Sequence, residues 1–227
     1  VEDFKNGFGS GHFLEIIVVV EHGKNLDHTA MLKRLNGKGV QYVLSHTVQS
    51  PVATMLKDAS SLGLVASSFG EEGKITFLGA HYTGGNDLVA LAGDSAENFY
   101  WTTSYIVTSE PGEGTDLQLA LAKKYNRDEK AANSHNYANG MMVAQVATEV
   151  IKRAKAKGKE INKETLYEEL LGMNGDNAFS PKTTVGDVTF SETDHAGVDT
   201  LQLYVVKDNT FMSEGSPFIP EYTSKIE

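Results

Sequence analysis

The sequence has no cysteine, and this absence removes several kinds of chemistry at once. The chain forms no disulfide, has no thiolate nucleophile and offers no sulfur ligand to a metal ion. The seven histidines form no close helical pair such as HExxH, and the carboxylates show no metal-loop spacing. We therefore expect no metal and no cofactor. The lack of cysteine is typical of some exported proteins, although many cytosolic proteins share it.

Motifs that mark enzymes are also missing. The glycine-rich stretch 7–11 precedes an apolar strand, whereas a dinucleotide fingerprint places its glycines between a strand and a helix. No GxSxG nucleophile elbow occurs. A flavodoxin-like enzyme would need a nucleophile–base pair or a cofactor loop, and neither is found. The sequence therefore predicts that the protein is not an enzyme.

Long hydrophobic runs and basic clusters are scarce. No purely apolar stretch is longer than Ile16–Val20, far short of the ~20 residues that span a membrane. The net charge is −10, and basic residues gather only at 152–159, so nucleic acid is not an expected partner. With 40% hydrophobic and 22% charged residues, the composition is that of an ordinary globular protein with a buried core.

The remaining pattern is a regular alternation of strands and helices. Runs rich in β-branched and aromatic residues predict strands over 13–21, 40–46, 75–80 and 98–107. Amphipathic stretches between them predict helices, including one over 51–63 that begins near Pro51 and ends at Gly63. Such an alternation indicates an α/β fold with a mostly parallel sheet and helices on both faces.

The second half of the chain adds two helices, over 137–157 and 163–171, and a last strand over 201–208. The stretch Leu91–Glu97 is similar to an LAG-DAAEG signature, and Asp194–Gly197 is similar to a DHxG turn. With this order of elements, the chain resembles the type I periplasmic binding proteins over almost its whole length. The branched-chain amino-acid receptors of ABC importers are the most similar group.

The resemblance implies a division into lobes. Residues 1–108 would form the second, C-terminal lobe, residues 109–183 the hinge crossing and helices of the first lobe, and residues 184–227 the return to the second lobe. Such receptors are longer than 227 residues, and this chain begins without Met, inside an expected helix. We therefore expect that part of the first lobe and one strand of the second are missing, unless the protein is naturally short.

The resemblance also implies a function. Such a protein captures a small polar or carboxylated ligand by closure of two lobes and delivers it to the permease subunits of an ABC importer. It would be periplasmic or extracellular, with a lipid anchor in a Gram-positive source. A ligand-sensing receptor ectodomain of the same fold is the alternative. Helices 137–171, without their parent sheet, would expose apolar surface and favour self-association.

Two predicted strand ends are candidate ligand contacts, because ligands of open α/β sheets bind beyond the carboxyl ends of strands. The predicted ligand-binding residues are Thr47, Val48, Gln49, Ser50, His81, Tyr82, Thr83 and Tyr105. Free backbone N–H groups at the following helix starts suit a carboxylate. The alternatives remain that Ser50 only caps a helix and that Tyr105 only packs in the core.

His81 has a distinct place in this set. In the resemblance it stands where the amino-acid receptors place an acidic residue that pairs with the ligand's ammonium group. A neutral imidazole has no charge to offer an ammonium group. The expected ligand is therefore an amino acid or a related carboxylated aromatic, keto acid or small amide, and His81 favours the last three over an ordinary amino acid unless it is only a loop residue.

Overall fold

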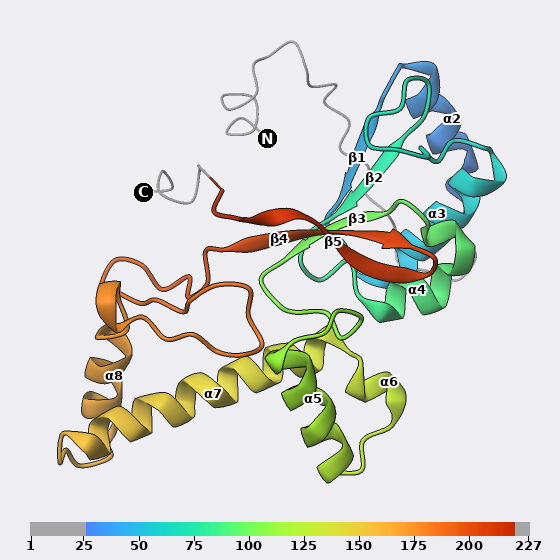
Figure 1. The fold of residues 1–227 in the computed structure, drawn as a ribbon. Coiled ribbons are helices and arrows are strands. Elements are labelled where there is room, and N and C mark those ends of the chain that lie inside the picture. The colour runs from blue at the N-terminus through green and yellow to red at the C-terminus, as the bar shows by residue number, and fades with distance from the viewer. Residues whose placement is uncertain (1–25, 221–227) are drawn as a thin grey trace.

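The computed structural model describes residues 26–220, in which one five-stranded sheet is combined with helices (Figure 1). The strands are β1 (Tyr42–Ser45), β2 (Thr76–Gly79), β3 (Tyr100–Thr103), β4 (Leu201–Lys207) and β5 (Thr210–Phe218). The α-helices are α2 (Thr29–Gly37), α3 (Gln49–Ser61), α4 (Asn86–Ala92), α5 (Glu113–Lys124), α6 (Glu129–Ala132), α7 (His135–Ala156) and α8 (Lys163–Leu171).

The first three strands form the parallel part of the sheet. β1 pairs with β2 in parallel, with Leu44 opposite Leu78, and β2 pairs with β3 in parallel. This confirms the predicted parallel arrangement for 40–46, 75–80 and 98–107. The predicted strand 13–21 lies outside the described residues.

The other two strands form an antiparallel hairpin, which makes the sheet mixed. β4 pairs antiparallel with β3, and β5 pairs antiparallel with β4. Asp208 and Asn209 link β4 to β5, and their φ angles are 51° and 58°. Two consecutive positive φ angles are what a tight hairpin turn requires, and Asp and Asn tolerate them. The sequence analysis predicted β4 but not β5.

The predicted strand 98–107 is only partly a sheet strand. Asn98 has a φ of 60°, so the strand does not extend to that residue, and β3 ends at Thr103. Beyond β3 the backbone pairs with a distant segment: Val185 N–H donates to Ser104 O at 2.9 Å and Ile106 N–H donates to Thr183 O at 3.2 Å. Residues 104–106 and 183–185 therefore lie side by side beyond the end of β3.

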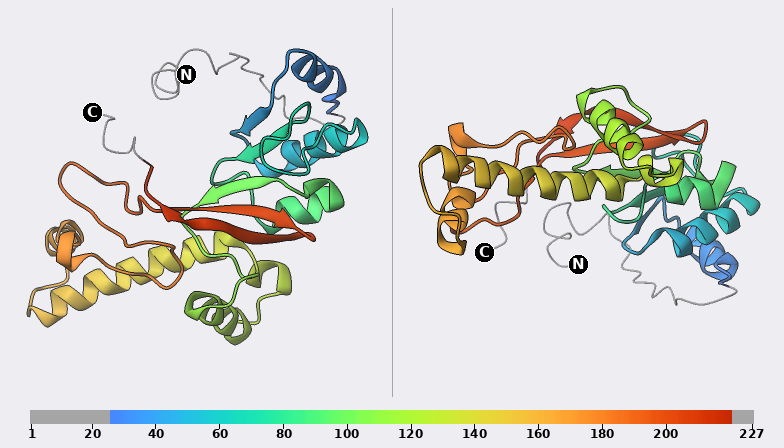
Figure 2. Two further views of the ribbon diagram at one scale, coloured as in Figure 1. Left: turned by 45° about the horizontal axis from the view of Figure 1, so that its top comes forward. Right: turned by 90° about the horizontal axis from the view of Figure 1, so that it is seen from below.

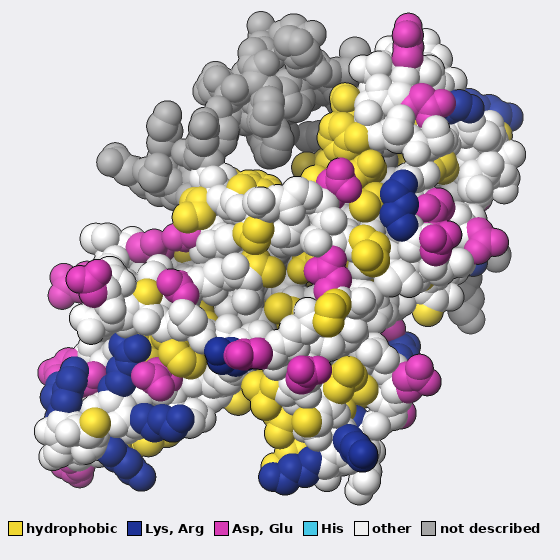
Figure 3. Space-filling view, viewed as in Figure 1, with side chains coloured by type: hydrophobic (Ala, Val, Ile, Leu, Met, Phe, Trp, Pro, Cys, Tyr) yellow, Lys and Arg dark blue, Asp and Glu magenta, His cyan; other side chains and the backbone are white. Residues whose placement is uncertain are grey.

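Helices α2, α3 and α4 pack on one face of the sheet. Leu32 of α2, Leu56 of α3 and Leu88 of α4 are buried in one cluster with Phe77 and Trp101 of the strands. The other face carries alternate residues of the same strands, and there Tyr42 is 48% and Leu44 57% exposed. Figure 3 shows hydrophobic side chains at the surface over β1 and β2.

Helix α3 starts two residues earlier than the sequence predicted. Its N-cap is Val48, with extended φ and ψ and no side-chain cap, and the helix begins at Gln49. Ser50 is therefore a helical residue and not an N-cap, and Pro51 is the third residue of the helix. The predicted end is confirmed, because Gly63 follows α3 with a φ of 64°.

The helices predicted over 137–157 and 163–171 are confirmed as α7 and α8. Figures 1 and 2 show that α7 begins beside the sheet and runs away from it, and that α8 packs near its far end. Lys157 and Lys159 pair with the buried Glu169 of α8 at 2.7 and 3.0 Å. The assignment of these helices to a separate lobe remains a prediction.

Candidate ligand-binding site at the strand ends

Thr83 joins the two predicted strand ends. Its buried hydroxyl donates to Thr47 O at 2.7 Å, and it also lies 3.2 Å from Ser45 O. Gln49 adds a second link, because its Nε2 donates to Gly84 O at 3.1 Å. The loops after β1 and β2 are therefore one unit, as expected for neighbouring parallel strands. The Thr83 hydroxyl thus makes its hydrogen bonds within the protein.

Tyr82 and Val48 form the exposed part of this unit. Tyr82 is 40% and Val48 47% exposed, and Ser50 is also exposed. The Tyr82 hydroxyl lies 2.5 Å from Nε2 of His46, and the two rings meet edge to face at 5.1 Å. The sequence analysis did not select His46, which links the end of β1 to the loop after β2.

His81 lies deeper, with its ring against the end of β3. Its Nδ1 is 3.0 Å from Thr103 Oγ1, and its carbonyl oxygen accepts a hydrogen bond from Trp101 Nε1 at 2.8 Å. Its ring centroid is 5.1 Å from that of Tyr105. Burial lowers the pKa of His81 below its ordinary value of 6.5, so the imidazole is neutral at pH 7. A neutral imidazole offers one donor and one acceptor.

Tyr105 connects this corner to α7. Its hydroxyl donates to Asn139 Oδ1 at 3.0 Å, and burial raises its pKa above 10.0. The residue is only 9% exposed. Tyr105 therefore both packs in the core and contacts His81, so the two roles considered from the sequence are compatible.

His135, the first residue of α7, was missed by the sequence analysis. Its ring is perpendicular to that of His81 at a centroid distance of 6.1 Å, and it lies 5.3 Å from Trp101. Burial, together with the nearby His81, lowers the pKa of His135 to about 4. The glycine pair Gly84-Gly85 was the feature of the sequence that could have indicated a close contact here. A Cβ atom on these residues would lie 2.2 Å from Trp101 and 2.3 Å from His135.

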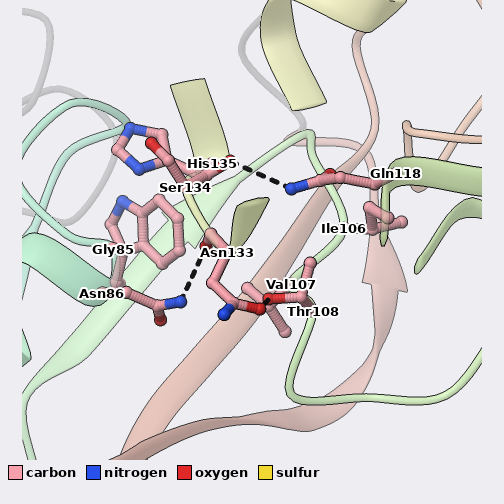
Figure 4. Close-up of a pocket in the computed structure, with 10 residues that line it drawn as sticks. Gly85, Asn86, Ile106, Val107, Thr108, Gln118, Asn133, Ser134 and His135 are labelled. Atoms are coloured by element: carbon pink, nitrogen blue, oxygen red, sulfur yellow. Dashed lines mark hydrogen bonds between the residues drawn. The ribbon is translucent and has the colours of Figure 1, made fainter. Parts of the chain in front are cut away.

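A small cavity lies between α4, α5 and the start of α7 (Figure 4). Its volume is about 10 Å³, whereas ligand pockets measure roughly 300–1,000 Å³. The hydrogen bonds around it fasten α7 to the rest of the protein: Asn86 Nδ2 donates to Asn133 O at 2.7 Å and Gln118 Nε2 to Ser134 O at 3.1 Å. This cavity, which His135 also lines, is too small for an amino acid.

Within residues 26–220, His, Asp and Glu side chains form no group of three that could hold a metal ion. In the same part of the chain, no helix is both long enough and apolar enough to cross a membrane.

Comparison with known proteins identifies the family. The family model described as periplasmic binding protein matches residues 14–210, which is most of the chain. The chain belongs to the periplasmic binding protein family. The five-stranded mixed sheet with its helices is part of the type I fold of these proteins, as the resemblance implied. The members of this family bind substrates and are not enzymes.

Solved structures support this membership. A branched-chain amino-acid ABC transporter protein from Thermus thermophilus, with bound valine, is 43% identical, with a TM-score of 0.79 over 89% of this chain. The isoleucine complex of LivJ from Streptococcus pneumoniae is 17% identical, with a TM-score of 0.62 over 87% of this chain. A fatty-acid ABC transporter binding protein from Thermomonospora curvata is 16% identical, with a TM-score of 0.68 over 89%. The last two similarities show the fold alone.

This binding protein spans only about half of those structures, covering 52%, 50% and 49% of their chains. No curated protein matches the sequence. The eight predicted ligand-binding residues therefore stay predictions, to which the geometry adds His46 and His135 as neighbours.

Proposed function

We propose that this chain is the solute-binding component of an ABC importer and that its ligand is a small carboxylated molecule. Membership of the periplasmic binding protein family supports this proposal, and so do the relatives, which are ABC transporter proteins. The relative from Thermus thermophilus holds valine, which favours a ligand with a short branched apolar skeleton.

The proposed ligand class is based on the residues that surround the His81 ring. Among the described residues, this ring has Thr103 as a hydrogen-bond partner and Tyr105 and His135 as ring neighbours, and none of these is a carboxylate. An ammonium group in this corner would be desolvated without a counter-charge, which is costly. A carboxylate or keto oxygen, by contrast, accepts a hydrogen bond from an imidazole N–H. We therefore favour the 2-oxo acid of a branched skeleton over the amino acid.

Ligand capture would follow the two-lobe mechanism. The ligand binds the loops after β1 and β2 and stabilises a closed state, because it contacts both lobes only when they are closed. The closed protein then delivers its ligand to the permease subunits in the membrane. This role places the protein in the periplasm or outside the cell.

Calorimetry with valine and with 3-methyl-2-oxobutanoate, the 2-oxo acid of the same skeleton, tests the ligand class. The longest natural polypeptide that carries these residues is the appropriate sample. We expect the 2-oxo acid to bind more tightly. His81→Ala should weaken this binding by about ten- to a hundredfold, the equivalent of about 1.5–3 kcal/mol for one hydrogen bond to a charged group.

A matched control is Tyr125→Ala, which removes an exposed side chain at the end of α5 and should leave affinity unchanged. His81→Glu should reverse the preference and favour valine. Tighter binding of valine to the unchanged protein would reject the 2-oxo acid. Absence of binding by any small carboxylate would reject the proposed ligand class altogether.

A further inference from the structure

We propose that His135 is a second imidazole of the ligand site, and that His81 and His135 together couple the binding of an anionic ligand to the uptake of a proton. This inference rests on the proposed function and adds a regulation to the same site. It makes the affinity for a carboxylate without an ammonium group increase as the pH falls below neutral.

The ring of His135 has unused hydrogen-bonding capacity. The residue is only 6% exposed, yet its ring nitrogens have no hydrogen-bond partner among the described residues. They are not among the fully buried atoms that lack a partner, so they retain surface that a ligand can reach. Gly85 leaves the space for this ring, because its φ of 103° is one that other residues rarely adopt and a Cβ there would lie 2.3 Å from Nδ1 of His135. The fold thus makes room for an imidazole and leaves it unbonded.

The ring of His135 lies beside that of His81. The two centroids are 6.1 Å apart at 90°, and they come from the loop after β2 and from the start of α7. Nδ1 of His81 faces Thr103 Oγ1, so Nε2 is the nitrogen left for a ligand. Two imidazoles from different elements therefore adjoin the same corner of the predicted site.

The groups around the two rings are mostly neutral. Around His81 the neighbouring groups are Thr103 of β3 and Tyr105 beyond it, both neutral at pH 7. Around His135 they are Trp101 of β3, His81, and Asp87 of α4, which lies 3.1 Å from the exposed Lys130. Asp87 raises the pKa of His135, but burial and the neighbouring His81 outweigh it.

His28 shows the opposite arrangement in the same chain. It is buried to the same 6%, but its Nδ1 lies 3.1 Å from the Asp58 carboxylate. Among the described residues, neither His81 nor His135 has such a direct carboxylate contact.

A ligand carboxylate would supply a direct contact of this kind. Burial holds the pKa of both imidazoles below 6.5, and an adjacent anion raises the pKa of a histidine. At a pH where the free pair is neutral and the ligand-bound pair is protonated, binding takes up a proton. The ligand therefore binds more tightly as the pH falls through this range. Each proton taken up changes the affinity by about tenfold per pH unit.

Calorimetry tests the coupling on the longest natural polypeptide that carries these residues, with 3-methyl-2-oxobutanoate as the probe. Titrations from pH 5 to pH 8, each in two buffers of different ionisation enthalpy, give the number of protons taken up. We expect proton uptake between these pH values and an affinity that falls as the pH rises. His135→Gln should reduce the uptake and flatten the pH profile, whereas His28→Gln should retain both.

His81→Gln is the second variant, because this half-buried side chain is replaced with less risk to folding than His135. Binding without proton uptake would overturn this inference and leave the proposed function intact. Uptake that survives in both His135→Gln and His81→Gln would also overturn it. Absence of binding at every pH would reject the proposed function together with the inference.

Discussion

A Cβ atom on Gly85 would lie 2.3 Å from Nδ1 of His135, so the loop before α4 and the first residue of α7 are in direct contact. Gly85 also has a φ of 103°, a backbone conformation that other residues rarely adopt. One glycine therefore fixes both the start of α4 and the place of the His135 ring.

We expect Gly85→Ala to destabilise the protein, because it adds backbone strain of about 1–3 kcal/mol and displaces a buried ring. Chemical denaturation measures the change. Gly93→Ala is the matched control, since its φ of 58° is also positive but no atom lies within 4 Å of the added Cβ. An equal effect of the two substitutions would show that the contact with His135 contributes nothing.

The low pKa of His135 predicts that the protein loses stability in mild acid. The unfolded chain takes up this proton near pH 6.5, whereas the folded protein takes it up only near pH 4. Between these values the unfolded state binds more protons, so the free energy of unfolding falls as the pH falls, by about 1.4 kcal/mol per unit and about 3 kcal/mol in all.

Urea denaturation at several pH values measures this slope, to which His81 contributes in the same direction. His135→Gln should reduce the slope, and His28→Gln should keep it, because it leaves the ring of His135 in place. A slope unchanged by His135→Gln would show that another group causes the acid sensitivity.

The Thr83 hydroxyl is expected to hold the two strand-end loops together. In Thr83→Val the side chain keeps its shape, but the Thr47 carbonyl oxygen loses its donor at 2.7 Å. Because this site is buried, the loss should cost about 1–3 kcal/mol. Thr54→Val is the control, since its hydroxyl makes only an exposed bond to Ser50 O at 3.3 Å, and it should change stability by less than about 0.5 kcal/mol.

The helices α7 and α8 present apolar side chains to solvent, with Val143 58% and Tyr167 50% exposed. We expect the isolated 227-residue chain to self-associate through such surfaces. Sedimentation over a range of concentrations measures this, and Val143→Lys should weaken the association. Thr148→Lys places the same charge at an exposed polar position of α7 and should have a smaller effect. A monomer at every concentration would contradict the prediction.

The sequence determined the elements whose pattern is local. Helix α8 was predicted with its observed bounds and α7 to within two residues, because both have a clear periodicity and polar ends. The parallel order of β1, β2 and β3 followed from their alternation with helices. The hairpin of β4 and β5 was not predicted from the sequence. Its Asp-Asn turn contains no glycine, and the mostly exposed residues of β5 show no regular alternation of apolar and polar side chains.

The residues that become neighbours in the predicted site could be identified only from the tertiary structure. The sequence predicted that residues 47–50 and 81–83 line one wall of a ligand pocket, which stays a prediction. The Thr83 and Gln49 hydrogen bonds show that the two loops are joined. The sequence did not bring His135 to His81, because 53 intervening residues separate them and only the folding of α7 against Trp101 makes them neighbours. The protonation of a histidine depends on what surrounds it in space. Burial, counter-charge and unused hydrogen bonds were therefore decided by packing, and only the identities of the residues by the sequence.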